Sequence, residues 1–179
     1  MRLFTAILYT DDILDEICKI KDRLGAEAVR GKMTKRENLH LTLAFPGETP
    51  PSKMPDIRRA MGKVAFDEFD ISLSGLGRFR RRCGDILWMG VTGSPGLQSL
   101  AGSCAAEFRK IGFALEDKEY VPHLTLGREV IMPQDFDPEN AKTPVLTQRV
   151  KEMSLMLSER VRGTLIYTPI LTVYPSGKQ

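Results

Sequence analysis

A tetrapeptide occurs twice in this sequence, as His40-Leu41-Thr42-Leu43 and as His123-Leu124-Thr125-Leu126, and it sets the strongest limit on the fold. Both copies lie in stretches where apolar and polar residues alternate, which predicts strands. Successive side chains of a strand point to opposite faces, so His and Thr share one face and the two leucines share the other. Each strand is therefore predicted to be anchored by its leucines and to display an imidazole beside a hydroxyl.

A helical segment precedes each copy at nearly the same spacing. Apolar residues recur at helical intervals from Ile13 to Gly25, ahead of His40, and again from Leu97 to Ile111, ahead of His123. This weak internal repeat favours an α+β fold of two similar lobes, each a mostly antiparallel sheet backed by helices, with the active-site cleft between them. We expect residues 1–179 to form one domain. A doubly wound parallel sheet is the competing architecture, since helices alternate with some of the strands.

The other expected elements follow from the same patterns. A second helix is predicted after Pro50-Pro51, where Ile57, Met61 and Val64 are spaced for one helical face. A polar surface loop is expected over 133–144. Strands are predicted at 3–9, at 39–45 with an end at Pro46-Gly47, and at 70–76, 85–91, 121–127, 150–157 and 165–173.

Charge and cysteine usage exclude several classes of protein. The net charge of +3 suits an anionic ligand but is too small for a nucleic-acid coat protein. The three cysteines are widely spaced and lack a Cys-x-x-Cys pair, so neither a disulfide framework nor a zinc cluster is expected. Asp11 and Asp12 interrupt the first apolar run, and no run of about 18 apolar residues follows. We therefore expect a cytoplasmic protein that is neither exported nor bound to a membrane.

The repeated residues suit acid/base chemistry on a phosphodiester. In-line opening of a cyclic phosphodiester needs a base for the attacking water and an acid for the departing ribose oxygen. Histidine serves both roles because its pKa, about 6.5, lets one imidazole be neutral while another is protonated. His40 and His123 are the only histidines in the chain. Threonine hydroxyls beside them could hydrogen-bond the non-bridging oxygens, and no metal or other cofactor is required.

At these motifs the sequence resembles the 2H phosphoesterases, and within them the RNA 2′,3′-cyclic phosphodiesterases, also called 2′-5′ RNA ligases. The resemblance extends over nearly the whole chain, and the two His-x-Thr motifs are its most specific part. One departure is Pro46, where the family usually has leucine. The supporting segments are Arg2-Leu3-Phe4, Asn38 to Gly47, Gly75 to Phe79 followed by Trp88, Pro122 to Arg128, and Leu155 to Glu159 with Gly163 and Tyr167 after it.

The resemblance implies specific roles for the repeated residues. His40 would be the proton donor and His123 the proton acceptor, with Thr42 and Thr125 holding the phosphate. The implied reaction hydrolyses the 2′,3′-cyclic phosphate at an RNA end to a 2′-phosphate, and a weak ATP-independent reversal would form 2′-5′ linkages. The expected partner is thus an RNA with a cyclic phosphate end, bound by a monomer.

Several other residues are candidates for the same site. Arg128 follows the second motif by two positions and could bind a phosphate, although a surface ion pair is the alternative. Phe45 could stack on a nucleobase or belong to the core. The arginine-rich segment 78–82 could follow an RNA backbone, but a solvated loop is the simpler interpretation. Trp88 is expected in the core because it lies in an apolar run.

Two other functions stay open at this point. The substrate could be a 2′-5′ oligonucleotide or a small cyclic nucleotide, or the chain could be a non-catalytic RNA-binding module. The sequence lacks the G-x-x-x-x-G-K-[ST] and G-x-S-x-G patterns, so a phosphate-binding loop and a serine hydrolase are disfavoured. A zinc enzyme is also disfavoured, because two distant histidines make a thin ligand set.

Overall fold

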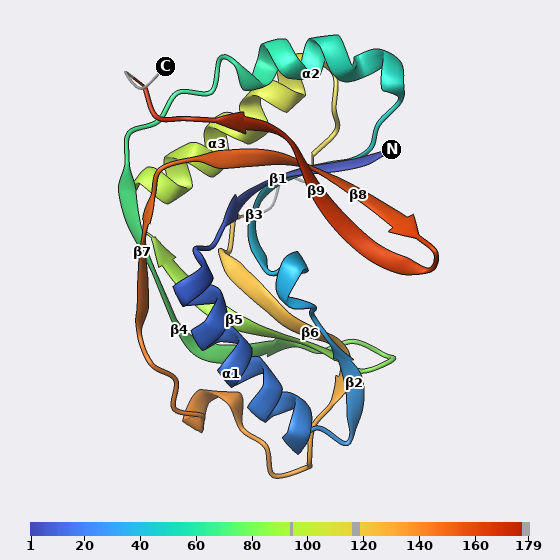
Figure 1. The fold of residues 1–179 in the computed structure, drawn as a ribbon, viewed down its shortest axis with the longest axis vertical. Coiled ribbons are helices and arrows are strands. Elements are labelled where there is room, and N and C mark those ends of the chain that lie inside the picture. The colour runs from blue at the N-terminus through green and yellow to red at the C-terminus, as the bar shows by residue number, and fades with distance from the viewer. Residues whose placement is uncertain (94, 116–118, 177–179) are drawn as a thin grey trace.

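A curled antiparallel sheet runs through the molecule in the computed structural model, which describes residues 1–93, 95–115 and 119–176 (Figure 1). The strands lie in the order β7-β4-β5-β6-β3-β1-β8-β9, and β2 pairs with β6 outside this path. Every pairing between them is antiparallel, which excludes the parallel alternative. The strands are β1 (Arg2–Leu8), β2 (Arg30–Met33), β3 (His40–Glu48), β4 (Phe69–Phe79), β5 (Asp85–Gly93), β6 (His123–Ile131), β7 (Leu146–Val150), β8 (Met153–Val161) and β9 (Thr164–Val173).

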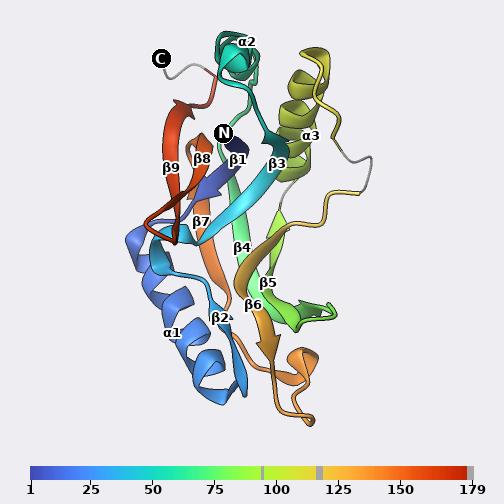
Figure 2. The same cartoon turned by 90° about the vertical axis from the view of Figure 1, so that its right-hand side faces the viewer.

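The sheet consists of two halves that meet between β3 and β6. Among the described residues these two strands share one paired position, Leu41 opposite Leu124. On one side of this junction lie β3, β1, β8 and β9, and on the other lie β6, β5, β4 and β7. The expected α+β fold with two antiparallel halves is therefore confirmed. Because β3 leaves β6 after so short a contact, β2 pairs along the remaining edge of β6 from Gly127 to Ile131 (Figure 2).

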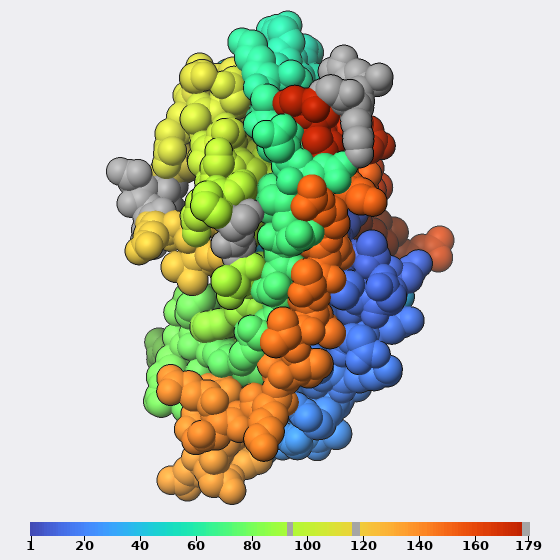
Figure 3. Space-filling view, turned by 90° about the vertical axis from the view of Figure 1, so that its left-hand side faces the viewer, coloured from blue at the N-terminus to red at the C-terminus, as the bar shows by residue number. Residues whose placement is uncertain are grey.

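The helices form where the apolar periodicity predicted them. Helix α1 (Asp11–Glu27) carries two acidic residues in its first turn and buries Ile13, Ile17, Ile20 and Leu24. It packs against β2 and β7, and Figure 3 shows α1 in blue along β7 in orange. Helix α3 (Pro95–Lys110) packs its buried stripe against β3, β4 and β5. The short α2 (Met54–Met61) lies on α3 and ends before Val64.

Three boundaries differ from the predictions. Strand β3 does not end at Pro46-Gly47 but continues to Glu48, because a bulge opposite β1 accommodates the proline and Gly47 adopts a φ of 77°. The strand predicted at 150–157 is divided between β7 and β8. Strand β2, Arg30–Met33, was not predicted because it has no apolar alternation; it forms on the backbone groups that β6 leaves open.

Short 3-10 turns complete the fold: η1 (Arg36–Asn38), η2 (Pro51–Lys53) and η3 (Pro138–Asn140). The last of these lies within the polar loop expected over 133–144. In the part of the chain that the structure describes, none of the helices is both long and apolar enough to cross a bilayer.

Candidate functional site

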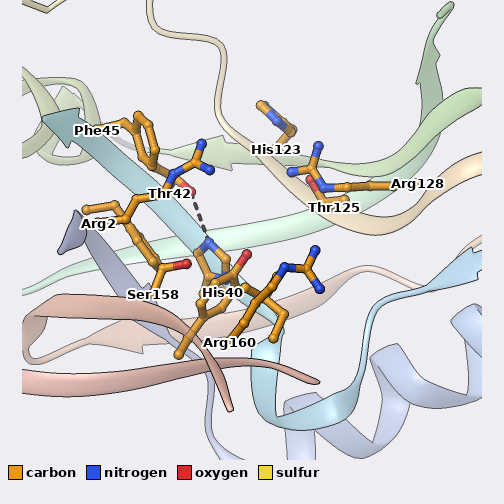
Figure 4. Close-up of a pocket in the computed structure, with 12 residues that line it drawn as sticks. Arg2, His40, Thr42, Phe45, His123, Thr125, Arg128, Ser158 and Arg160 are labelled. Carbon is orange, nitrogen blue, oxygen red and sulfur yellow. Dashed lines mark hydrogen bonds between the residues drawn. The ribbon is translucent and has the colours of Figure 1, made fainter. Parts of the chain in front are cut away.

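The two repeated tetrapeptides meet where the halves of the sheet join. Leu41 and Leu124 are paired across β3 and β6, and both are fully buried. Because strand residues alternate between faces, the histidine and threonine on either side of each leucine point to the opposite face. The antiparallel register brings Thr42 toward His123 and His40 toward Thr125. All four side chains line one cavity of about 400 Å³ (Figure 4).

The remaining two predicted site residues line the same cavity. Arg128 lies three positions beyond Thr125 on β6, where strict alternation would turn it to the other face. A register shift between β5 and β6 lies between these two residues, and Arg128 is exposed and lines the cavity. Phe45 is 43% exposed, so it is not a core residue, and the guanidinium carbon of Arg2 lies 4.9 Å from its ring centre. Trp88 and the 78–82 segment do not line this cavity, although Trp88 packs against one of its histidines.

Each imidazole is oriented by a hydrogen bond to the backbone carbonyl two residues before it. The Nδ1 atom of His40 lies 2.7 Å from the carbonyl oxygen of Asn38, and that of His123 lies 2.8 Å from the carbonyl oxygen of Val121. A carbonyl can only accept, so Nδ1 carries the proton and donates it in each ring. The Nε2 atoms are then the nitrogens left for chemistry. In His40 this atom lies 3.0 Å from the hydroxyl oxygen of Thr42.

Aromatic rings from different strands support each histidine. Phe4 and Tyr167 lie 4.8 Å and 5.1 Å from the His40 ring, measured between ring centres. Phe79 and Trp88 contact His123 in the same way, at 5.1 Å and 6.3 Å. These contacts limit the rotation of both imidazoles, so that each ring is held in place before any ligand binds.

A buried amide in η1, the turn that precedes β3, joins this turn to strand β9. The side-chain nitrogen of Asn38 donates to the Leu165 carbonyl at 2.9 Å, and its oxygen accepts from the Tyr167 amide at 3.2 Å. Asn38 also supplies the carbonyl that orients His40. This one residue therefore positions both the His40 ring and the tyrosine that packs on it.

The cavity is strongly positive. Its lining includes Arg2, Arg128 and Arg160 and contains no Asp or Glu. Across the described residues, none of these three arginines forms an ion pair. The pKa of His40 is lowered from 6.5 to about 4, chiefly by burial and also by the charges of Arg128 and His123, while its bond to the Asn38 carbonyl opposes the shift. His40 is thus neutral at pH 7 in the free protein, and the cavity is suited to an anion.

Sequence reasoning did not assign Arg2, Ser158, Arg160 and Tyr167 to the site, although all four line the cavity. Ser158 and Arg160 sit two positions apart on β8, so alternation alone would have put them on one face. Nothing in the sequence indicates that this face lies beside β3 and β6. That position follows from the order of strands in the sheet.

The described residues contain no group of three or more His, Cys, Asp and Glu side chains placed to hold a metal ion. The cavity offers imidazoles, hydroxyls and guanidinium groups instead.

Comparison with known proteins gives consistent results. The sequence model of the 2′-5′ RNA ligase superfamily matches residues 11–162. An RNA 2′,3′-cyclic phosphodiesterase of Methanothermobacter thermautotrophicus is 33% identical over 177 residues, covering 94% of this chain and 95% of the relative. One of Archaeoglobus fulgidus is 37% identical over 130 residues, covering 72% of each chain. Among solved structures, Escherichia coli LigT complexed with 3′-AMP superposes with a TM-score of 0.83 at 27% identity, over 98% of both chains.

Proposed function

Since the chain belongs to the 2′-5′ RNA ligase superfamily, we propose that it hydrolyses 2′,3′-cyclic phosphates at RNA ends to 2′-phosphates. The observation that carries this proposal is the pair of imidazoles, each with its Nδ1 tied to the backbone, on one cavity rich in arginine. The curated relatives named RNA 2′,3′-cyclic phosphodiesterase support the class of reaction.

In the proposed step, His123 takes a proton from a water molecule while the water oxygen forms a bond to phosphorus. The bond between phosphorus and O3′ breaks, and His40 gives its proton to O3′, which leaves a free 3′-hydroxyl and a 2′-phosphate. Donor and acceptor must lie on opposite sides of phosphorus for this in-line displacement. Placement of His40 and His123 on neighbouring strands, one from each half of the sheet, supports this arrangement.

Hydroxyl and guanidinium groups would stabilise the transition state. Thr42 and Thr125 can donate to the non-bridging oxygens, on which negative charge increases during the attack. Arg128 can pair with one of them through its forked guanidinium. In this role Arg128 would compensate the negative charge of the phosphate without taking part in proton transfer.

A donor needs a proton, and in the free protein His40 is neutral at pH 7 because its pKa is about 4. The negative charge of a bound phosphate favours the protonated imidazole and offsets the repulsion from Arg128. We therefore expect substrate binding to raise the pKa of His40. Ligation would use the same groups: a 5′-hydroxyl in place of water would form the bond to phosphorus, O3′ would leave with a proton, and a 2′-5′ linkage would result without ATP.

The test is an assay on an RNA oligonucleotide that ends in a 2′,3′-cyclic phosphate, with the product phosphate located. We expect a 2′-phosphate from the wild-type protein and a loss of about 10²- to 10⁴-fold in kcat for His40→Asn and for His123→Asn. Asparagine keeps a donor for the backbone carbonyl, so the local structure is preserved while the Nε2 chemistry is lost.

Parallel substrates separate the alternatives. A 2′-5′ oligonucleotide and a small cyclic nucleotide are assayed beside the RNA, and a preference for either would contradict the proposed substrate. Retention of RNA binding with no turnover of any substrate would instead favour a binding module. Wild-type activity in either histidine variant would contradict the acid/base roles.

A further inference from the structure

Two grooves leave the cavity in different directions. One, which we call the basic groove, is about 410 Å³ in volume and runs between β2, η1, β6 and the β8–β9 hairpin; its charged residues are Lys32, Lys35, Arg128, Glu129 and Arg160. The other, the apolar groove, runs between the end of β3 and α3 and is lined largely by small and apolar residues such as Ala101, Ala105 and Leu115. The two grooves share no lining residue.

Each groove joins the cavity at different groups. The basic groove shares His40, Thr125, Arg128 and Arg160 with the cavity, whereas the apolar groove shares Thr42, Phe45 and His123. Figure 4 shows Phe45 on one side of His40 and the guanidinium groups of Arg128 and Arg160 on the other. A nucleotide whose phosphate lies between the histidines would thus have Phe45, with Arg2 beside its ring, on one side and the guanidinium groups of Arg128 and Arg160 on the other (Figure 4).

These surroundings suit different parts of an RNA end. Aromatic rings bind nucleobases by stacking, and Phe45 is 43% exposed for such a contact. Backbone phosphates bind to lysine and arginine. A terminal nucleotide whose base stacks on Phe45 would direct the chain that precedes it toward the basic groove.

We propose that the basic groove is a subsite for the phosphodiester that joins the terminal nucleotide to its 5′ neighbour. This subsite rests on the proposed function, and it makes the protein prefer a strand end over a single cyclic nucleotide. Its volume of about 410 Å³ lies at the lower end of the range for small-ligand pockets, which fits one further nucleotide.

The cations of the groove are available to a phosphate. Lys35 is exposed, and its ammonium has no hydrogen bond or ion pair within the described parts of the chain. Lys32 pairs with Glu129 at 2.7 Å, but both side chains are more than half exposed, so this ion pair is weak and can be exchanged. Arg160 uses one N–H on the Gly163 carbonyl at 3.2 Å, which leaves the other donors of its guanidinium for a ligand.

The experiment compares a nucleoside 2′,3′-cyclic phosphate with a dinucleotide that ends in the same group. We expect the wild-type protein to have about a tenfold higher kcat/KM for the dinucleotide. This ratio corresponds to the free energy that one hydrogen bond to a charged group contributes. In Lys32→Gln/Lys35→Gln this preference should fall to about two-fold or less. Lys63→Gln removes one charge from an exposed lysine that lines neither groove, and its preference should equal that of the wild type.

A binding measurement makes the two proposals separable. Affinities of a nucleoside 2′-phosphate and of a dinucleotide ending in a 2′-phosphate are measured by calorimetry at several salt concentrations. The salt dependence of dinucleotide binding should be shallower in the double variant, since about one phosphate contact is lost. If both substrates turn over but the preference survives in the double variant, the basic groove is not the subsite and the proposed function stands. If neither substrate turns over, the proposed function fails. Tighter binding of the dinucleotide than of the nucleoside 2′-phosphate, lost in the double variant, would then still support the subsite, and equal binding of the two would contradict it.

Discussion

Lowering the pH should destabilise this protein through one identifiable imidazole. His40 has a pKa of about 4 in the folded protein, against about 6.5 in an unfolded chain. Between these two values the unfolded chain binds a proton that the folded protein does not, so the free energy of unfolding falls as the pH falls from 6.5 toward 4. Above pH 6.5 both states carry a neutral His40, and the effect is absent.

The size of this effect follows from the pKa difference. Each pKa unit corresponds to about 1.4 kcal/mol, so the full shift is worth about 3 kcal/mol, and about 2 kcal/mol of it is lost between pH 7 and pH 5. Other groups titrate in the same interval. Their contribution is removed by comparing the wild type with His40→Asn, in which position 40 no longer titrates.

Urea denaturation at pH 7 and pH 5 measures the effect. We expect the wild type to lose about 2 kcal/mol more than His40→Asn over this interval. The pKa itself can be read by NMR, because the chain has two histidines and the variant assigns their signals. Equal losses in both proteins, or a measured pKa near 6.5, would refute the argument that burial and Arg128 keep this ring neutral.

The same titration tests the proposed role of His40 as donor. Saturating inorganic phosphate should raise the pKa of His40, because an anion bound in this arginine-lined cavity would favour the protonated imidazole. A pKa that stays near 4 with phosphate bound would leave His40 unable to donate at neutral pH.

Two further predictions can be measured on the same preparations. Turnover of the cyclic phosphate should persist in EDTA with a bell-shaped pH dependence, since the proposed scheme uses two imidazoles; loss of activity that a divalent ion restores would contradict it. Gly77→Ala should lower the free energy of unfolding by about 1–3 kcal/mol in urea titrations, because an added Cβ would lie 2.2 Å from the Trp88 ring. Gly102→Ala, inside α3, meets no atom within 4 Å and should instead raise it by up to about 1 kcal/mol through helix propensity. Equal stability of both variants would refute the packing argument.

Much of the fold and the centre of the site could be predicted from periodicity alone. Leu41 and Leu124 are buried as the alternation required, and His40 and His123 accordingly face the cavity. The same reasoning failed for β2, whose residues have no apolar pattern, because that strand depends on an edge of β6 that exists only in the folded protein. It also ended β3 too early, since a bulge allows Pro46 within the strand.

The sequence by itself determined which side chains stand beside one another on each strand, because alternation is a local property of the backbone. Only the tertiary structure decided that Arg2, Ser158 and Arg160 would join them, because these residues come from strands whose order in the sheet no local pattern encodes. The unequal surroundings of the two histidines have the same origin. The two tetrapeptides are identical, but the rings and charges packed around His40 come from distant parts of the chain, and they set its pKa.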